Sequence, residues 1–190
     1  SETDLMGSNF GECLFADCDL SMTKLTGITL RDTRFERCKM LGVKFDQCNE
    51  LLFSVSFFQC QLDFASFYNR SLSKTEFEEC RLLEVDFTEA DLSEARFTQS
   101  DLSGAIFLHT NLEQCDFRTA VNHQIDPEEN RMKKARFSLG GLGGLLLKYD
   151  LEIENLGSVA LLEAIKAKLS TNQQTLNHGT ELQQTKTIYW

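Results

Sequence analysis

Cysteines, histidines and carboxylates are the residues of this chain that could do chemistry. Seven thiols could bind a metal or form disulfides, and a thiol near a histidine could act as a nucleophile. However, His109, His123 and His178 stand apart, with no spacing to cysteines or acids that is typical of metal ligands. The glycine-rich run 140–144 lacks the Lys-Ser/Thr pair of a phosphate-binding loop. The sequence therefore predicts a protein that is not an enzyme, with no catalytic residue, no metal site and no cofactor.

The net charge narrows the choice of partner. With 29 acidic and 19 basic residues, the formal charge is −10 and the sequence pI is about 4.8. Direct nucleic-acid binding is disfavoured, because phosphate-binding surfaces depend on lysine and arginine. No segment approaches the roughly 18 to 20 apolar residues that span a bilayer, and the N-terminus has no apolar signal core. We expect a cytoplasmic protein without membrane contact. Its acidic residues either favour basic partners or only keep the protein soluble.

A period of five residues organises most of the chain. Leu, Phe or Met occupies every fifth position from Leu5 to Phe45 and, after a slip of two residues at 46–51, from Leu52 to Phe117. The residue two before each centre is small or slender, and Glu50 and Arg70 are the misfits. A period of five matches neither a helix nor a strand, so an amphipathic helix or strand does not explain it.

This pattern resembles that of the pentapeptide repeat family, most openly in 90–94 (Ala-Asp-Leu-Ser-Glu) and 100–104 (Ser-Asp-Leu-Ser-Gly). The resemblance implies an all-β solenoid, a right-handed quadrilateral β-helix with four pentapeptides in each coil. The centre and the residue two before it then point inward, and residues 20 apart stack at about 4.8 Å. Because Leu and Phe alternate after the slip, we expect the phenylalanines to form two stacks on opposite faces.

Within this frame all the cysteines occupy the small inward position, so we interpret them as core fillers. Stacked cysteines would stand one coil apart, too far for a disulfide without distortion, and free buried thiols favour a reducing compartment. The set is Cys13, Cys18, Cys38, Cys60, Cys80 and Cys115, with Cys48 if the first register is extended.

Stacking also predicts which surface charges are paired. Glu76, Arg96 and Asp116 form a ladder of alternating sign, Lys74 faces Glu94, and Arg81 faces Asp101. Six outward acids remain without an obvious partner and form a candidate partner-binding acidic surface, for which ordinary solvation remains the alternative. These are Glu78, Glu79, Glu84, Asp86, Glu89 and Asp91.

The two-residue slip predicts a bulge or kink, beside which several aromatic side chains point outward. They are either a contact patch or a shield for irregular backbone. The aromatic residues of this candidate patch are Phe53, Phe58, Phe64 and Tyr68.

The period fades after Phe117, and we expect four regions: a repeat region 1–120, a loop with a last partial rung at 121–137, a helical dimerisation segment 138–154, and an amphipathic helix with a disordered tail at 155–190. Ser138 is a candidate N-cap of the third region. An apolar stripe at i, i+4, i+7 and i+11 of that helix predicts a two-fold homodimer. It consists of Leu142, Leu146, Tyr149 and Ile153.

Residues 122–126 (Asn-His-Gln-Ile-Asp) and 135–139 (Ala-Arg-Phe-Ser-Leu), followed by 145–146 and 150–153, resemble the C-terminal signature of topoisomerase-protecting pentapeptide repeat proteins, the Qnr type of quinolone resistance and the albicidin-resistance factor. The segments 39–43, 87–91 and 97–102 resemble the same group. The resemblance implies a dimeric DNA mimic with carboxylates along its length. Such a mimic binds DNA gyrase or topoisomerase IV and protects it from a quinolone or albicidin-like poison, conferring antibiotic resistance. The alternative function is a structural solenoid that binds another protein through the aromatic patch.

Overall fold

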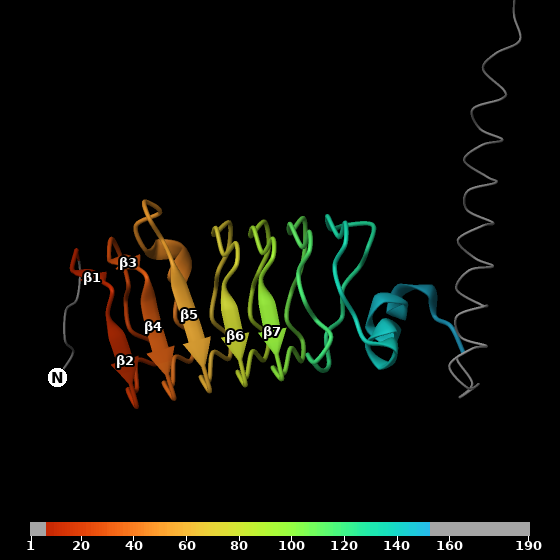
Figure 1. Ribbon diagram of the computed structural model, residues 1–190, viewed down its shortest axis with the longest axis horizontal. Helices are drawn as coiled ribbons and strands as arrows, with labels where there is room; N and C mark the ends of the chain where they lie inside the picture. The colour runs from red at the N-terminus through yellow and green to blue at the C-terminus, as the bar shows by residue number, and fades with distance from the viewer. Residues whose placement is uncertain (1–6, 153–190) are drawn as a thin grey trace, which may run out of the picture. The chain divides into compact units, whose positions relative to one another are not determined.

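Parallel pairing between residues one coil apart builds the fold, as the computed structural model shows for residues 7–152, the part of the chain it describes (Figure 1). Phe77 pairs with Phe97, and the same spacing of 20 recurs at Gln61 with Arg81. The contacts within the chain divide it into two units. Residues 1–150 form the unit that contains the coils, and residues 151–190 form the second unit, nearly all of which lies outside the described part.

Most sides of the coil form no more than an isolated bridge, and five of the seven regular strands gather on one face. The five-stranded parallel sheet has the order β2-β4-β5-β6-β7, and β1 pairs with β3 in a second sheet. The strands are β1 (Asn9–Gly11), β2 (Leu14–Ala16), β3 (Thr29–Arg31), β4 (Thr33–Glu36), β5 (Val55–Phe58), β6 (Glu76–Glu78) and β7 (Arg96–Thr98).

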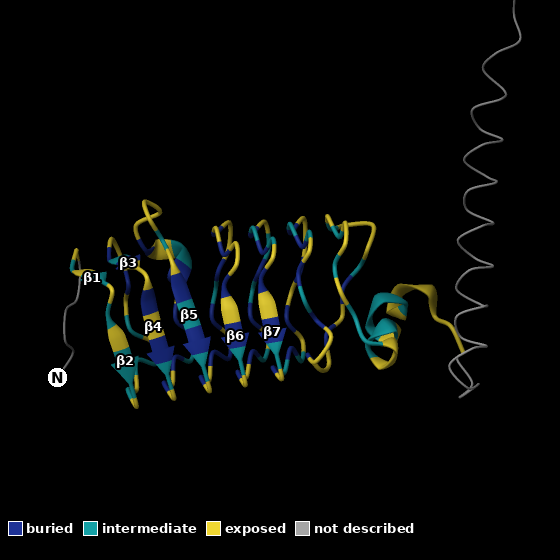
Figure 2. Cartoon of the chain, in the orientation of Figure 1, coloured by how far each residue is buried: buried dark blue, intermediate teal, exposed yellow. Residues whose placement is uncertain are grey.

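Two phenylalanine stacks fill the interior, which confirms the expectation from the alternating centres. Phe77 stacks on Phe97 with ring centroids 4.9 Å apart, and Phe67 stacks on Phe87 at 5.4 Å. Across the interior, the rings of Phe77 and Phe87 meet edge to face at 5.9 Å, so the core is only two rings wide. Figure 2 shows exposed residues at the tips of the turns.

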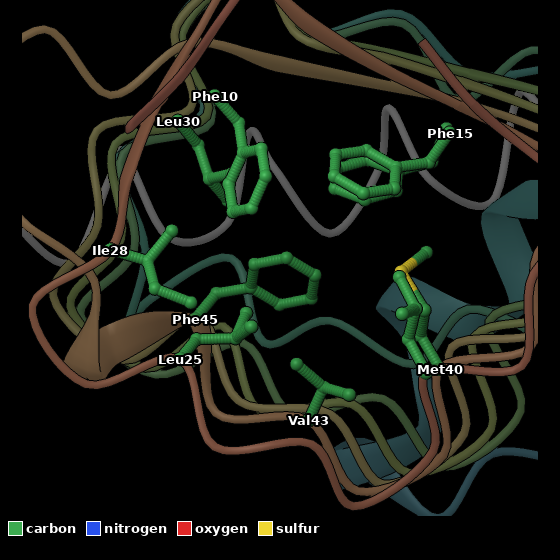
Figure 3. Close-up of a pocket in the computed structure, with 10 residues that line it drawn as sticks. Phe10, Phe15, Leu25, Ile28, Leu30, Met40, Val43 and Phe45 are labelled. Atoms are coloured by element: carbon green, nitrogen blue, oxygen red, sulfur yellow. The ribbon is translucent and has the colours of Figure 1, made fainter. Parts of the chain in front are cut away.

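The core is more exposed in the first described coils. Phe10, Phe15 and Leu20 are only half-buried there, and a cavity of about 20 Å³ lies among the inward side chains. Figure 3 shows the side chains of Phe10, Phe15, Met40 and Phe45 pointing toward this common space. The cavity is wholly apolar and too small for more than a water molecule, so it is part of the core and not a ligand site.

The predicted slip appears as one coil with two extra residues. Thr33 pairs with Val55 and Lys44 with Ser66, a spacing of 22 in place of 20. A short 3-10 helix, η1 (Phe45–Gln47), precedes the insertion, and the extra residues leave the coil between Cys48 and Ser54. The loop projects beyond neighbouring turns in Figure 1.

Leu52 was expected to be an inward centre, and this is wrong. It lies in the loop, 61% exposed and with a positive φ of 61°, while Phe53 is half-buried against the core. Arg70, the misfit at a small inward position, explains the arrangement. Its guanidinium is buried and donates to the backbone carbonyls of Asp46 and Cys48, so it holds the loop from within.

The corners of the coil share one backbone conformation. The residue two after each centre has φ between about 50° and 70° at nearly every corner, the left-handed region that glycine adopts without steric cost. Gly104 is one such corner, with φ of 67°. Glutamate, aspartate and asparagine fill many of the others, so the corners point polar side chains outward.

The helix expected from residue 138 is present in a different form. It consists of two 3-10 helices, η2 (Leu139–Leu145) and η3 (Leu147–Tyr149), and the predicted N-cap is confirmed by Ser138 Oγ, which accepts from Gly141 N at 3.2 Å. Three residues per turn replace the 3.6 of an α-helix, so the predicted apolar stripe does not form one face.

The glycines in η2 allow close packing on the end of the solenoid. The carbonyl of Gly141 accepts from Nε2 of His123 at 2.9 Å, and a Cβ at Gly144 would stand 1.9 Å from the His123 carbonyl oxygen. The ring of His123 is buried against Phe117 and Phe137, with centroid distances of 5.7 and 5.3 Å. We call residues 139–149 the C-terminal cap.

Candidate functional site

Most of the net charge of the chain is concentrated in one coil. Residues 76–95 contain eight carboxylates and a single cation, Arg81, which gives a net charge of −7 (eight minus one). By the same count the preceding coil, 56–75, carries +1 and the following coil, 96–115, carries −1. We call the eight acids the acidic belt: Glu76, Glu78, Glu79, Glu84, Asp86, Glu89, Asp91 and Glu94.

The belt surrounds the coil. Glu79, Glu84, Glu89 and Glu94 occupy its four successive corners, each with a positive φ between 52° and 60°. The other members lie on the sides between these corners. This differs from the distribution along the length of the solenoid that the family resemblance implied, because the neighbouring coils are nearly neutral.

Two belt members have cationic partners, as the stacking predicted. Glu76 accepts from Arg96 at 2.5 Å, and Glu94 lies 3.9 Å from Lys74, both between exposed side chains. Such exposed pairs contribute about 0 to 1 kcal/mol each. The other six members are the six acids predicted to lack partners, and among residues 7–152 none of them lies within 4.0 Å of a lysine or arginine nitrogen.

Neutral hydrogen bonds orient several of these six carboxylates without neutralising them. Glu79 accepts from Gln59 at 2.7 Å, and Asp91 accepts from Asn111 at 2.7 Å. Tyr68 donates its hydroxyl to Glu89 at 3.1 Å, and this bond to a carboxylate raises the pKa of the Tyr68 phenol. The negative charges are therefore held in position and remain available to an external cation.

Arg81 pairs with a residue that the stacking argument missed. Its expected partner was Asp101, but its guanidinium donates to Asp63, with Nε 2.9 Å from Oδ1. The Asp63 carboxylate is 1% exposed, whereas the Arg81 side chain is 55% exposed. Asp63 follows a leucine centre directly, and a repeat pattern alone gives no signal that such an outward position is covered.

The candidate aromatic patch divides into two parts. Phe53 and Phe58 are half-buried, with the guanidinium carbons of Arg70 and Arg34 5.7 and 5.9 Å from their respective ring centroids. Phe64 and Tyr68 are exposed, at 54% and 43%. Two residues outside the predicted patch, Leu51 and Leu52, are more exposed still, at 71% and 61%.

Three of the four predicted dimerisation residues lie on the C-terminal cap. Leu142 and Leu146 are half-buried, Tyr149 is 41% exposed, and Ile153 lies outside the described residues. Lys148 fixes this end to the preceding loop through Asp126 at 2.7 Å and Glu128 at 2.6 Å. Its ammonium hydrogen bonds hold the pKa of both carboxyls below their usual range. The apolar surface left open on the cap includes Leu147, at 57% exposure.

The thiols occupy the core positions expected of them. All seven cysteines are free, and five of them are buried. Burial raises the pKa of the Cys48 thiol to about 12. It also raises the pKa of the Cys115 thiol above its usual range, so both are poor nucleophiles. Residues 7–152 hold no group of three or more metal-binding side chains, and no helix among them is long and apolar enough to cross a membrane.

The fold and the repeat define the class of protein: a β-solenoid of five-residue repeats. A family model described as "Pentapeptide repeat region" matches residues 8–87, and a second, "Pentapeptide repeats (8 copies)", matches residues 80–118. The chain belongs to the pentapeptide repeat family. No protein with curated annotation matches the sequence.

Two solved structures of pentapeptide repeat proteins are similar to this chain to different degrees. QnrB1, a plasmid-mediated fluoroquinolone resistance protein, is 15% identical and has a TM-score of 0.54, with 81% of this chain and 94% of that chain covered. HetL, a pentapeptide repeat protein involved in heterocyst differentiation regulation in the cyanobacterium Nostoc sp. strain PCC 7120, is 13% identical over 72% of this chain and 89% of its own, with a TM-score of 0.27. The likeness to QnrB1 shows the shared fold.

Proposed function

We propose that this protein binds the DNA-binding surface of a type II topoisomerase, DNA gyrase or topoisomerase IV, and protects the enzyme from a quinolone or albicidin-like poison without catalysing a reaction. The acidic belt carries the proposal. It offers a basic surface several fixed carboxylates that no cation of the described residues neutralises. QnrB1, which has the same fold, is a fluoroquinolone resistance protein, and this supports the choice of partner.

Over a short distance, the charge density of the belt is more than twice that of DNA. B-DNA carries one charge per roughly 1.7 Å, or about three charges over the 4.8 Å rise of one coil. The belt coil carries a net −7 over the same rise, and its neighbours carry +1 and −1. Mimicry is therefore local: the belt presents a ring of charge to a basic cradle and does not imitate a long duplex.

Two further features belong to the same proposal. The protein acts as a homodimer through the exposed apolar side chains of the C-terminal cap, among them Leu147 and Tyr149. Free thiols in the core suit the reducing cytoplasm, where the topoisomerases work. Light scattering that shows a monomer at micromolar concentration would count against the dimer without touching the belt.

A gyrase supercoiling titration with and without ciprofloxacin tests the proposal. We expect the wild-type protein to restore supercoiling in the presence of the drug over part of the concentration range. Protein that neither restores supercoiling nor inhibits gyrase at any concentration would refute the proposal.

A variant with a neutral acidic belt tests whether the charges of the belt bind the partner. The variant replaces Glu78, Glu79, Glu84 and Glu89 with Gln and Asp86 and Asp91 with Asn, which keeps size and hydrogen bonding. At up to about 1 kcal/mol per exposed charge contact, the loss of three to six contacts amounts to about 3 kcal/mol, a loss of more than a hundredfold in affinity. The control Glu12→Gln/Asp19→Asn/Asp150→Asn removes exposed charges outside the belt and should leave affinity within about threefold.

A second candidate function is a structural solenoid that binds another protein through the projecting loop. The exposure of Leu51 and Leu52 at its tip favours it, since adjacent exposed leucines are unfavourable unless a partner covers them. The double variant Leu51→Ser/Leu52→Ser separates the two candidates. If it leaves gyrase protection intact but abolishes the capture of another partner, the loop serves a scaffolding role.

A further inference from the structure

Exposed large hydrophobic residues lie on one side of the solenoid near the belt. Between residues 56 and 115 there are four such side chains: Phe64, Tyr68, Ile106 and Leu108, exposed by 54%, 43%, 49% and 40%. Tyr68, Ile106 and Leu108 flank phenylalanine centres of one column, that of Phe87, and Phe64 occupies the corner that leads into it. We call this side, with its two corners, the Phe87 face.

The backbone register places acids between these apolar residues. Asp86 pairs with Ser66 in the preceding coil and with Ile106 in the following coil. Glu89 donates its backbone N–H to the carbonyl of Leu108 at 2.9 Å, and its carboxylate accepts from Tyr68. On the Phe87 face, one row of acids is thus bordered by aromatic side chains on one side and aliphatic side chains on the other.

Glu84 completes the row at the corner. A Cβ at Gly104 would approach Glu84 Cγ to 3.0 Å, so the Glu84 side chain lies over the bare backbone of the next coil, two residues from Ile106. The six unpaired acids therefore divide evenly. Three lie on the Phe87 face, and the other three, Glu78, Glu79 and Asp91, lie on sides without exposed large hydrophobic residues between residues 56 and 115.

We propose that the Phe87 face is the side of the belt that contacts the protein partner, and that it fits a surface with a row of lysine or arginine bordered on both sides by apolar residues. The inference rests on the proposed function, because the belt is the same site, but it selects one of the four sides. Charge complementarity determines the occupant: the acids attract cations and repel nucleic acid, and the apolar borders require partner side chains to cover them.

The two kinds of contact give this face a distinct salt dependence. Charge–charge attraction weakens as salt shortens the Debye length, whereas burial of Phe64, Tyr68, Ile106 and Leu108 does not depend on screening. A partner held only by the belt would dissociate at high ionic strength. A partner held by the Phe87 face retains part of its affinity there.

The test uses substitutions that copy residues already present in the same columns. Ile106→Ser reproduces Ser66 and Leu108→Thr reproduces Thr88, so the fold is kept. The control pair Leu14→Thr/Val121→Ser removes apolar residues that are at least as exposed, by 59% and 50%, from other sides. Two further variants each remove three charges from the belt. Glu84→Gln/Asp86→Asn/Glu89→Gln neutralises the acids of the Phe87 face, and Glu78→Gln/Glu79→Gln/Asp91→Asn neutralises the other three.

Two probes are titrated with each variant: gyrase, and a synthetic amphipathic peptide of lysine and leucine. We expect Ile106→Ser/Leu108→Thr and Glu84→Gln/Asp86→Asn/Glu89→Gln to lower affinity for both probes by about tenfold or more each. Their matched controls, Leu14→Thr/Val121→Ser and Glu78→Gln/Glu79→Gln/Asp91→Asn, should lower it by less than about twofold. Equal losses from both halves of the belt, or no loss from Ile106→Ser/Leu108→Thr, would overturn the inference. Wild-type protein that binds the peptide but not gyrase would instead overturn the proposed function and leave the face to be judged by the peptide alone.

Discussion

Replacing Arg70 with alanine distinguishes the structure from the repeat pattern, because the two predict opposite signs. Arg70 occupies a small inward position, and the equivalent position one coil later is occupied by Ala90. The repeat pattern alone therefore predicts that Arg70→Ala stabilises the fold. In the structure the guanidinium is the donor for the carbonyls of Asp46 and Cys48, inside the coil with two extra residues. We therefore expect Arg70→Ala to destabilise the protein.

The magnitude follows from the groups left behind. The buried carbonyl of Cys48 and the partly buried carbonyl of Asp46 lose their donor at about 1 to 3 kcal/mol each, and the contact with the Phe53 ring at 5.7 Å contributes about another 1 kcal/mol. In the opposite direction, Nε and Nη1 of Arg70 have no hydrogen-bond partner among the described residues, and removing them relieves roughly 1 to 3 kcal/mol. Taken at their midpoints, with about 5 kcal/mol lost and about 2 kcal/mol relieved, these contributions give an expected net loss of about 3 kcal/mol.

Urea unfolding of Arg70→Ala measures this loss, with Arg96→Ala as the control. Arg96 is 61% exposed and pairs with Glu76 at the surface, so its removal should cost no more than about 1 kcal/mol. Hydrogen exchange should also accelerate between Cys48 and Ser54 in the Arg70 variant. A variant as stable as Arg96→Ala, or more stable than the wild type, would show that the loop does not depend on the buried guanidinium.

Other predictions concern the core and the cap. Phe87→Ala should lower the free energy of unfolding in urea by about 3 to 5 kcal/mol, whereas Phe64→Ala should change it by no more than about 0.5 kcal/mol. Similar losses from the two variants would contradict the inward position of Phe87 and the outward position of Phe64. Gly144→Ala should detach the cap. The amide of Ile125 donates to the Gly144 carbonyl at 3.0 Å, so its hydrogen exchange should become faster in this variant, and unchanged exchange would mean that the cap is not packed this way. Burial holds the pKa of His123 below its ordinary 6.5, so its contribution to cap stability is complete above about pH 6.5 and is lost as the pH falls through the lowered value. Exchange at Ile125 should thus accelerate from pH 7.5 to about pH 5 after correction for intrinsic rates, and a flat profile would exclude His123 as the cause.

The sequence was sufficient for the solenoid because each centre makes the same contact in every coil. The period of five, the inward cysteines and the paired phenylalanine stacks all follow from local spacing, and all are present. The insertion was also visible, since two extra residues shift every later centre. Its internal structure was not, because Leu52 continues the period while the chain has already left the coil, and the backbone there is held by Arg70 from the next coil.

The candidate site was predictable in its residues and not in its geometry. The six unpaired acids were found by stacking alone, but their arrangement as a belt depends on where a coil begins and ends. The bond from Tyr68 to Glu89 links an aromatic and an acid that the sequence assigned to competing functions. Asp63 was missed as the partner of Arg81 because its burial arises from neighbouring side chains and not from its place in the repeat.

Competition with DNA is the most direct test of the central claim that the acidic belt occupies a DNA-binding surface. The measurement follows labelled duplex DNA bound to gyrase while the protein is added. We predict that the wild-type protein displaces the DNA and that the neutral-belt variant, with Glu84, Asp86 and Glu89 among its six substitutions, does so only at concentrations more than about a hundredfold higher. Displacement by both proteins at the same concentration, or binding of wild-type protein and DNA to gyrase together, would contradict it.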